Sequence, residues 1–177
     1  MKYIPTIAKL LLKKLIFSSL FLLATTQIST AQNVVWANGI TNPNTIISVK
    51  NICTNQLGET YAVGQFKNTV DFDAGPGFDT INANIITPQG NAGFITKTDN
   101  AGNHLWAKAL IPYATNAGSI MYDVAEDMNG NVYVAGVYNK AIDFDPGAAI
   151  DSLNVSGTAG SFVMKLDAAG NFLWAKT

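Results

Sequence analysis

The sequence predicts an all-β protein built from tandem, four-stranded antiparallel sheets. The segment Ser161–Lys176 has a twin at Gly93–Lys108, 68 residues earlier, and ten of the 16 aligned positions are identical. Apolar runs of strand length alternate with clusters of Asp, Gly and Asn along the rest of the chain. An internal repeat of this clarity determines the architecture, although it does not determine the molecular activity.

Each copy of the twin segment is expected to form a β-hairpin. In the second copy, Phe162–Leu166 and Phe172–Ala175 are the apolar runs, and Asp-Ala-Ala-Gly-Asn separates them. The Asp side chain can accept from backbone N–H groups two residues on, and Gly adopts positive φ without steric cost. The same turn recurs at Asp127–Asn131 and, degraded, at Asn55–Glu59. Each repeat therefore holds two hairpins, or four strands.

Three tryptophans, at positions 36, 106 and 174, mark the period of the repeat. The strand Val132–Tyr138 is apolar on both faces, which indicates a strand that is covered on both sides. Between the last two tryptophans the order is a strand, a Gly-Asn turn, a second strand, an acidic loop, a short run and the hairpin described above: Ile120–Glu126, Val132–Tyr138, Asp143–Asp151, Leu153–Val155 and Phe162–Lys176.

Four antiparallel strands with two apolar faces, repeated in tandem, are typical of the blades of a β-propeller, in which neighbouring blades bury each other. A flat stack of sheets or a β-solenoid is the alternative, but solenoid coils are usually shorter than this period. The repeats run over about 36–105 and 106–177 within a repeat region of 32–177. Because a ring needs about four to eight blades, this one is incomplete, and we expect further blades in cis or self-association.

Residues 1–31 are predicted to be a signal peptide. Four lysines precede an apolar segment, Leu15–Ala24, whose length of about ten residues is that of a signal-peptide core rather than of a membrane span. Ser29-Thr30-Ala31 places small residues at a cleavage site. The alternative is an N-terminal membrane anchor. We expect an exported protein, secreted or at the cell surface, without stable membrane insertion after cleavage.

The charge of the remaining chain argues against polyanionic partners. Residues 32–177 keep seven lysines against 12 Asp and Glu, a net charge of about −5, and the sequence has no Arg. Nucleic acids and anionic membranes bind clustered Lys and Arg, so neither is expected as a partner. The single cysteine, Cys53, excludes an internal disulfide and is interpreted as a small core residue on a strand.

The acidic loops contain the candidate metal ligands. The two loops match one for one, with carboxylates at i, i+2 and i+8: Asp71, Asp73, Asp79 and Asp143, Asp145, Asp151. Carboxylates on a Gly-containing loop can gather oxygens around Ca²⁺, although the pattern lacks the features of an EF-hand. Calcium is the only cofactor that the sequence suggests.

Two other interpretations of the acidic loops remain open. Asp-Pro-Gly can simply make a turn whose carboxylates lie in water. Alternatively, Asp79-Thr80-Ile81 and Asp151-Ser152-Leu153 are similar to the Asp-Ser/Thr-aliphatic acceptor for O-glycosylation of exported bacterial proteins, and a glycan there would be surface-facing.

The sequence offers little for catalysis, so no catalytic residue is assigned. His104, the only histidine, matches Phe172 and is interpreted as a packed strand residue, yet a Ser-His-Asp site would have to use it. Paired carboxylates could serve a glycosidase, but each acidic-loop Asp is repeated with the repeat, whereas a catalytic site is normally unique. The tryptophans could stack on sugars, although a strictly repeated strand position favours packing between blades.

The repeats resemble the SBBP (beta-propeller) repeats of secreted bacterial proteins. The matching segments are Asp143–Gly147, Gly130–Gly136 and Phe162–Lys176, whereas the first repeat departs at Asp71–Gly77 and at Gly58-Glu59. The resemblance implies a multi-blade, exported or surface protein of Gram-negative bacteria and says little about activity.

Together these observations predict an exported, non-enzymatic β-propeller repeat protein that acts as a binding or adhesion scaffold for an unidentified protein or glycan. A secreted propeller hydrolase that acts on polysaccharide is the alternative. The hydrolase would need a residue pair that breaks the repeat, whereas the scaffold needs none.

Overall fold

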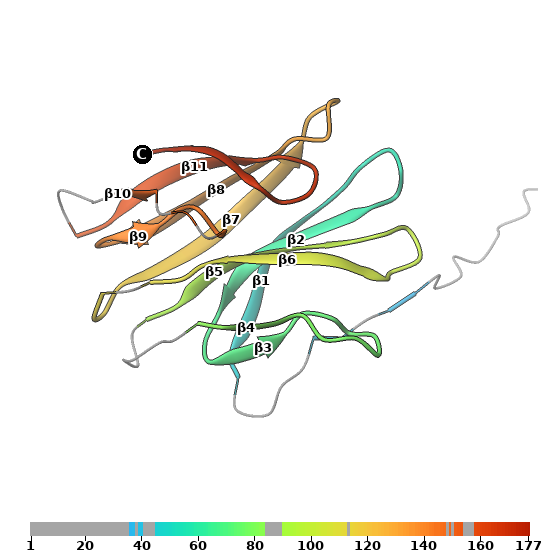
Figure 1. Ribbon diagram of the computed structural model, residues 1–177, viewed down its shortest axis with the longest axis horizontal. Coiled ribbons are helices and arrows are strands. Elements are labelled where there is room, and N and C mark those ends of the chain that lie inside the picture. Colours follow the sequence, from blue (N-terminus) through green and yellow to red (C-terminus); the bar gives the residue numbers. More distant parts are fainter. Residues whose placement is uncertain are drawn as a thin grey trace, which may run out of the picture. The chain divides into compact units, whose positions relative to one another are not determined.

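The computed structural model describes residues 36–37, 39–40, 45–83, 90–112, 114–147, 149, 151–153 and 158–177, so the predicted signal peptide lies outside it. The described part is all-β, as predicted, and contains no helix long and apolar enough to cross a bilayer (Figure 1). Its strands are β1 (Ile47–Thr54), β2 (Thr60–Phe66), β3 (Thr69–Asp71), β4 (Thr80–Asn82), β5 (Ala92–Thr98), β6 (His104–Leu110), β7 (Gly118–Glu126), β8 (Val132–Asn139), β9 (Ile142–Asp143), β10 (Ser152–Leu153), β11 (Gly160–Leu166) and β12 (Phe172–Lys176).

The long strands form two four-stranded antiparallel sheets of the same design. The first sheet has the order β1-β2-β5-β6, and the second has the order β7-β8-β11-β12. Between the second and third strands of each sheet a two-stranded ribbon is inserted, β3-β4 in the first and β9-β10 in the second. The chain passes from one sheet to the other between Leu110 and Gly118.

The pairing register is the same in both sheets. Tyr61 lies opposite Lys97 in the first sheet, and Tyr133 lies opposite Lys165 in the second. The ladder irregularities also recur, between Val49 and Asn51 and between Met121 and Asp123 in the first strands, and after Lys97 and Lys165 in the third strands. Because a one-residue slip would move every side chain to the opposite face, equal registers give the two sheets equivalent faces.

The predicted hairpin turns explain the common register. Asp99 Oδ1 accepts hydrogen bonds from the backbone N–H groups of Ala101 and Asn103, each at 2.8 Å, and Asp167 makes the corresponding bonds at 2.9 Å. Glycine takes positive φ at the same place in all four turns, at Gly58, Gly102, Gly130 and Gly170. A turn that needs this conformation strongly prefers glycine and fixes the strands on either side of it.

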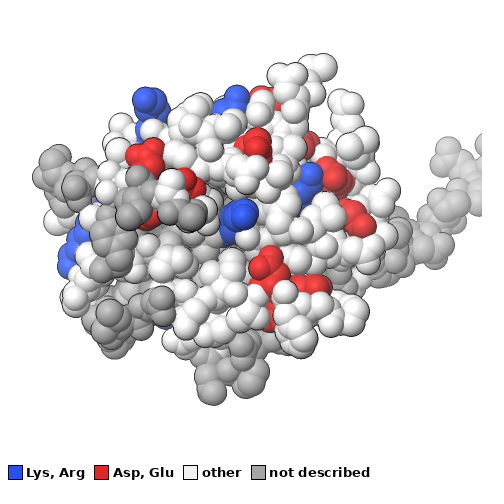
Figure 2. All heavy atoms as spheres, in the orientation of Figure 1, with Lys and Arg blue, Asp and Glu red and all other residues white. Residues whose placement is uncertain are grey.

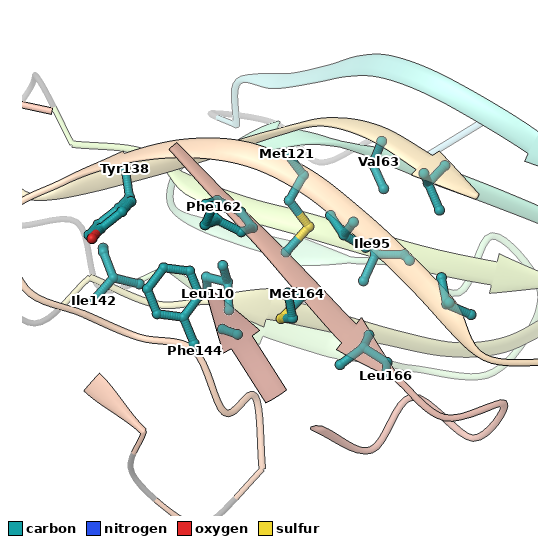
Figure 3. Close-up of a cluster of buried hydrophobic side chains, with 14 of the residues drawn as sticks. Val63, Ile95, Leu110, Met121, Tyr138, Ile142, Phe144, Phe162, Met164 and Leu166 are labelled. Carbon is teal, nitrogen blue, oxygen red and sulfur yellow. The ribbon is translucent and has the colours of Figure 1, made fainter. Parts of the chain in front are cut away.

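The sheets pack face to face. We call the face that carries Tyr61 and Ile95 in the first sheet, and Tyr133 and Val163 in the second, the back face, and the opposite one the front face. The front face of the second sheet covers the back face of the first, and β7 lies against β1, β2 and β5. Tyr61, Val63 and Ile95 from the back face are fully buried there, as are Met121, Val134 and Met164 from the front face. Figure 3 shows Val63 and Ile95 together with Met121 and Met164 in this cluster.

An aromatic cluster anchors each ribbon to the front face of its own sheet. In the first sheet Phe72, which follows β3, meets Phe66 edge-on at a centroid distance of 5.3 Å and also contacts Phe94. In the second sheet Phe144 meets Tyr138 at 5.2 Å and Phe162 at 4.9 Å. Each ribbon is therefore packed against its own sheet. This packing fixes the position of the acidic loops, which connect β3 to β4 and β9 to β10.

The glycine that ends Tyr61-Ala-Val-Gly64 in the first sheet and Tyr133-Val-Ala-Gly136 in the second is required by close packing. A β-carbon on Gly136 would lie 2.2 Å from the carbonyl oxygen of Ile120 and 2.7 Å from the ring of Phe162. We predict that Gly136→Ala lowers the free energy of unfolding by about 2–3 kcal/mol through overpacking. Ser161→Ala, an exposed change on the neighbouring strand, should cost less than about 0.5 kcal/mol. Urea denaturation measures both, and equal losses would contradict the packing argument.

Candidate functional site

The first acidic loop is organised by Asp71. Its Oδ1 accepts hydrogen bonds from the backbone N–H groups of Asp73 at 3.1 Å and of Asp79 at 2.9 Å. Asp73 Oδ1 in turn accepts from the N–H of Gly75 at 2.7 Å. The loop therefore closes on its own carboxylates, as expected for Asx-type turns.

The second acidic loop repeats this arrangement. Asp143 Oδ1 accepts from the N–H groups of Asp145 at 3.1 Å and of Asp151 at 2.9 Å, and Asp145 Oδ1 accepts from Gly147 at 2.7 Å. The predicted spacing of i, i+2 and i+8 thus brings the three residues of each loop together. The first carboxylate serves as the hydrogen-bond acceptor for the backbone of the other two.

The calcium assignment stays a prediction. Within the described residues no group of three or more Asp, Glu, His or Cys side chains is arranged to hold a metal ion. The hydrogen bonds explain why the Asp spacing repeats without invoking a ligand, because each bonded oxygen already has a backbone partner. The glycosylation motifs lie beside the same loops, at the start of β4 and β10, so their hydroxyls belong to short ribbon strands.

Asp79 differs from its counterpart because it binds the only histidine. Its Oδ2 lies 2.7 Å from Nε2 of His104 and accepts from the N–H of Ala107 at 2.9 Å. Nδ1 of His104 lies 3.4 Å from Oγ1 of Thr96, which is buried. His104 is thus a packed strand residue, as predicted, but its bond to Asp79 was missed. This pair is specific to the first sheet, since Phe172 occupies the position of His104 in the second.

A cleft opens where the hairpin turns of the two sheets lie side by side. It has a volume of about 660 Å³ and lies between the β1-β2 turn and the β7-β8 turn. Its wall combines apolar side chains with carboxylates, and Leu57 and Met128 are highly exposed. The residues that define it here are Leu57, Glu59, Lys97, Glu126, Asp127 and Met128. We call it the turn cleft.

Buried polar pairs hold the base of the turn cleft. Lys97 Nζ lies 2.8 Å from Oε2 of Glu59, and its hydrogen bond lowers the pKa of that carboxyl group. The hydroxyl of Tyr61 donates to Oε1 of Glu126 at 2.7 Å and joins the two sheets. Burial, and then this bond, raise the pKa of the Tyr61 phenol far above its ordinary value. The Glu59 carboxyl group therefore stays ionised and the Tyr61 phenol stays protonated at neutral pH.

The turns that rim the cleft are stabilised by carboxylate–amide pairs. Asn131 Nδ2 donates to Oδ2 of Asp127 at 2.8 Å, and with the backbone N–H of Asn131 it lowers the pKa of Asp127 to about 2. The Asn side chains of the corresponding turns lower the pKa of Asp99 and of Asp167 in the same way. Figure 2 shows acidic side chains interspersed with lysines on one face of the molecule.

The tryptophan between the sheets covers a turn glycine. Trp106 on β6 lies against Gly170 of the second sheet, and its indole Nε1 donates to the carbonyl of Ala168 at 3.3 Å. This confirms that Trp106 packs between the sheets. Cys53 also packs against the core between them, as predicted.

Comparisons of the chain with protein-family models, with curated proteins and with solved structures give no match.

Sequence reasoning did not identify the turn cleft. Its polar pairs join residues from different hairpins, such as Tyr61 and Glu126, which are 65 positions apart. A sequence signal for one pair was present, because Lys97 recurs as Lys165 on strands that are otherwise apolar. A lysine retained on an apolar strand indicates a buried partner.

The capping role of Asp143 can be separated from calcium binding. We predict that Asp143→Ala, measured by urea denaturation in chelator, lowers the free energy of unfolding by about 1–2 kcal/mol, because two backbone N–H groups lose their acceptor. Asp143→Asn keeps an acceptor oxygen and should lose less. Calcium binding has a separate test on the unchanged protein. If the loops bind calcium, millimolar calcium will raise its melting temperature relative to the value in chelator. Identical melting temperatures would contradict the calcium prediction.

The turn carboxylates predict a defined pH response. Because the pKa of Asp127 in the folded state, about 2, lies below its ordinary value of 3.8, its contribution to stability is complete above about pH 4. That contribution is lost as the pH falls towards 2. We predict that Asn131→Ala raises the pKa of Asp127 towards 3.8, as measured by NMR titration. An unchanged pKa would mean that the amide is not its cause.

Proposed function

We propose that this chain is an exported, non-enzymatic β-propeller repeat protein that serves as a binding or adhesion scaffold outside the cell. The observation that carries the proposal is the equivalence of the two stacked sheets, which share strand order, register and turn chemistry. Stacking of like sheets through apolar faces is how propeller blades bury their surfaces. The resemblance to SBBP repeats and the signal-peptide pattern support export and a place at the cell surface.

The turn cleft is the proposed ligand site of the scaffold. A cleft of about 660 Å³ is within the range of sites that hold small ligands. Exposed Leu57 and Met128 offer apolar contact area, and the carboxylate of Glu126, whose Oε1 accepts from Tyr61, has a second oxygen that can accept a hydrogen bond from a ligand. This combination suits the C–H faces and hydroxyls of a glycan, or a polar protein loop. A stack of such sheets would repeat the cleft at every junction and bind its ligand multivalently.

One observation favours the polysaccharide hydrolase as the second candidate. The pair of His104 and Asp79 breaks the repeat, and His104 shares a cavity of about 280 Å³ with Asp73. However, Asp79 already accepts a backbone N–H, and the hydroxyl beside His104 belongs to buried Thr96. The pair therefore has the geometry of a structural bond between the acidic loop and β6, and we place the hydrolase second.

Export is tested by expressing the chain with its leader in a Gram-negative host. We expect the exported fraction to contain a protein whose first residue is Gln32, identified by mass spectrometry. A chain that stays in the cytoplasm with residues 1–31 attached would contradict the export part of the proposal.

Binding and hydrolysis are tested together on immobilised bacterial polysaccharides and cell-envelope proteins. We expect retention without release of reducing sugar, and Met128→Asp should weaken retention by about tenfold or more if it removes a contact at the centre of the site. Phe78→Asp, an equally exposed aromatic residue outside the cleft, is the matched control. Sugar release that His104→Phe abolishes would establish the hydrolase in place of the scaffold.

A further inference from the structure

The back face of the second sheet repeats an interface that is already formed within the chain. On the first sheet the back-face residues Tyr61, Val63 and Ile95 are fully buried by the second sheet. Their register equivalents are Tyr133, Ala135 and Val163. These are half-buried or exposed, and 42% of Val163 is accessible. The second sheet thus presents an apolar face of the kind that its neighbour has covered.

The front face of the first sheet has the apolar residues that could pack against such a back face. In the interface within the chain, β7 contributes Met121 and Val124, which are buried. The equivalent residues on β1 are Val49 and Ile52, and they are 52% and 62% exposed. Apolar side chains have therefore been kept at the two positions that insert into a neighbouring back face, although water surrounds them here.

Trp36 already occupies one contact position on the front face of the first sheet. A β-carbon on Gly170 would lie 3.2 Å from Cδ2 and Cε3 of Trp106. A β-carbon on Gly102 would lie 2.7 Å from Cδ2 and 3.0 Å from Cε3 of Trp36. The same edge of an indole thus covers the equivalent turn glycine of each sheet. Trp36 therefore sits over the first sheet as Trp106 sits over the second.

We propose that a second copy of this chain docks head to tail, with the back face of its second sheet on the front face of the first sheet. In this arrangement Trp174 of one copy takes the place over Gly102 that Trp36 occupies, so Trp36 competes with the incoming copy. The interface is a continuation of the one between the two sheets and does not depend on export or on the ligand proposed above. Such an interface uses different surfaces on the two partners and can propagate.

The composition of the front face predicts a weaker contact than the one within the chain. The first sheet carries polar or small residues where the second has larger apolar ones: Thr60, Ala62, Thr98 and His104 stand in place of Val132, Val134, Leu166 and Phe172. Less apolar area is therefore removed from water on docking. The head-to-tail contact should be reversible and dependent on concentration.

Competition by Trp36 is tested by sedimentation velocity over a range of concentrations. We expect Trp36→Ala to strengthen self-association by about tenfold or more, the change that about 1.4 kcal/mol produces, and Trp174→Ala to weaken it. Phe78→Ala, which removes an exposed aromatic ring of the acidic loop rather than of a strand in either face, should leave it unchanged. If Trp36→Ala associates as weakly as the unchanged protein, or more weakly, the proposal that Trp36 competes with the incoming copy is wrong.

The orientation is tested by complementation between two surface variants. Val163→Asp breaks the back face, and Ile52→Asp breaks the front face; both residues are exposed, so folding should be retained, as circular dichroism can verify. Each variant alone is expected to remain monomeric, whereas an equimolar mixture should form dimers through the two intact faces. Dimers of Ile52→Asp alone would show back-to-back pairing, and a mixture that stays monomeric would show that no such interface exists; either result overturns the proposal.

Discussion

The contact between the front face of one sheet and the back face of the next is the constraint on which the rest of the structure depends. Each four-stranded sheet is apolar on both faces, so a single sheet would leave one face in water. Met121 and Met164 fill the space opposite Val63 and Ile95 (Figure 3). Burial of such side chains contributes about 1.5–3 kcal/mol each, so the sheets stabilise each other far more than either could stabilise itself.

This contact requires both sheets to have the same register, and the turns provide it. The Asp-x-x-Gly-Asn turns fix the hairpins through local hydrogen bonds, and the ladder irregularities after Lys97 and Lys165 come at the same place. A slip of two residues along β5 of the first sheet would place Lys97 where Ile95 now packs and bury a charge without its partner Glu59. The cost of an unpaired buried charge is several kcal/mol, which makes alternative registers unfavourable.

The sequence was sufficient for the features that local chemistry determines. The strands and the hairpin turns follow from residues within a few positions of each other, such as Asp99 and Asn103. The bonds by which Asp71 closes its loop were not predicted, because the spacing of the carboxylates alone suits a calcium site or a turn in water equally well. The two-stranded ribbons were not predicted, because β9 and β10 have two residues each and carry no periodic pattern. The bonds from His104 to Asp79 and from Tyr61 to Glu126 were also missed, since tertiary packing alone brings these residues together.

The two open faces of the stack differ for a physical reason. Thr60 has a hydroxyl that water can bind and a methyl group that can pack, so this part of the front face of the first sheet tolerates exposure and contact alike. On this face His104 uses Nε2 to bind Asp79 of the acidic loop. The back face of the second sheet carries larger side chains, Tyr133, Val163 and Trp174, whose apolar area remains partly accessible. Its aromatic pair, 6.3 Å apart, gains from being covered and gives the stack a direction.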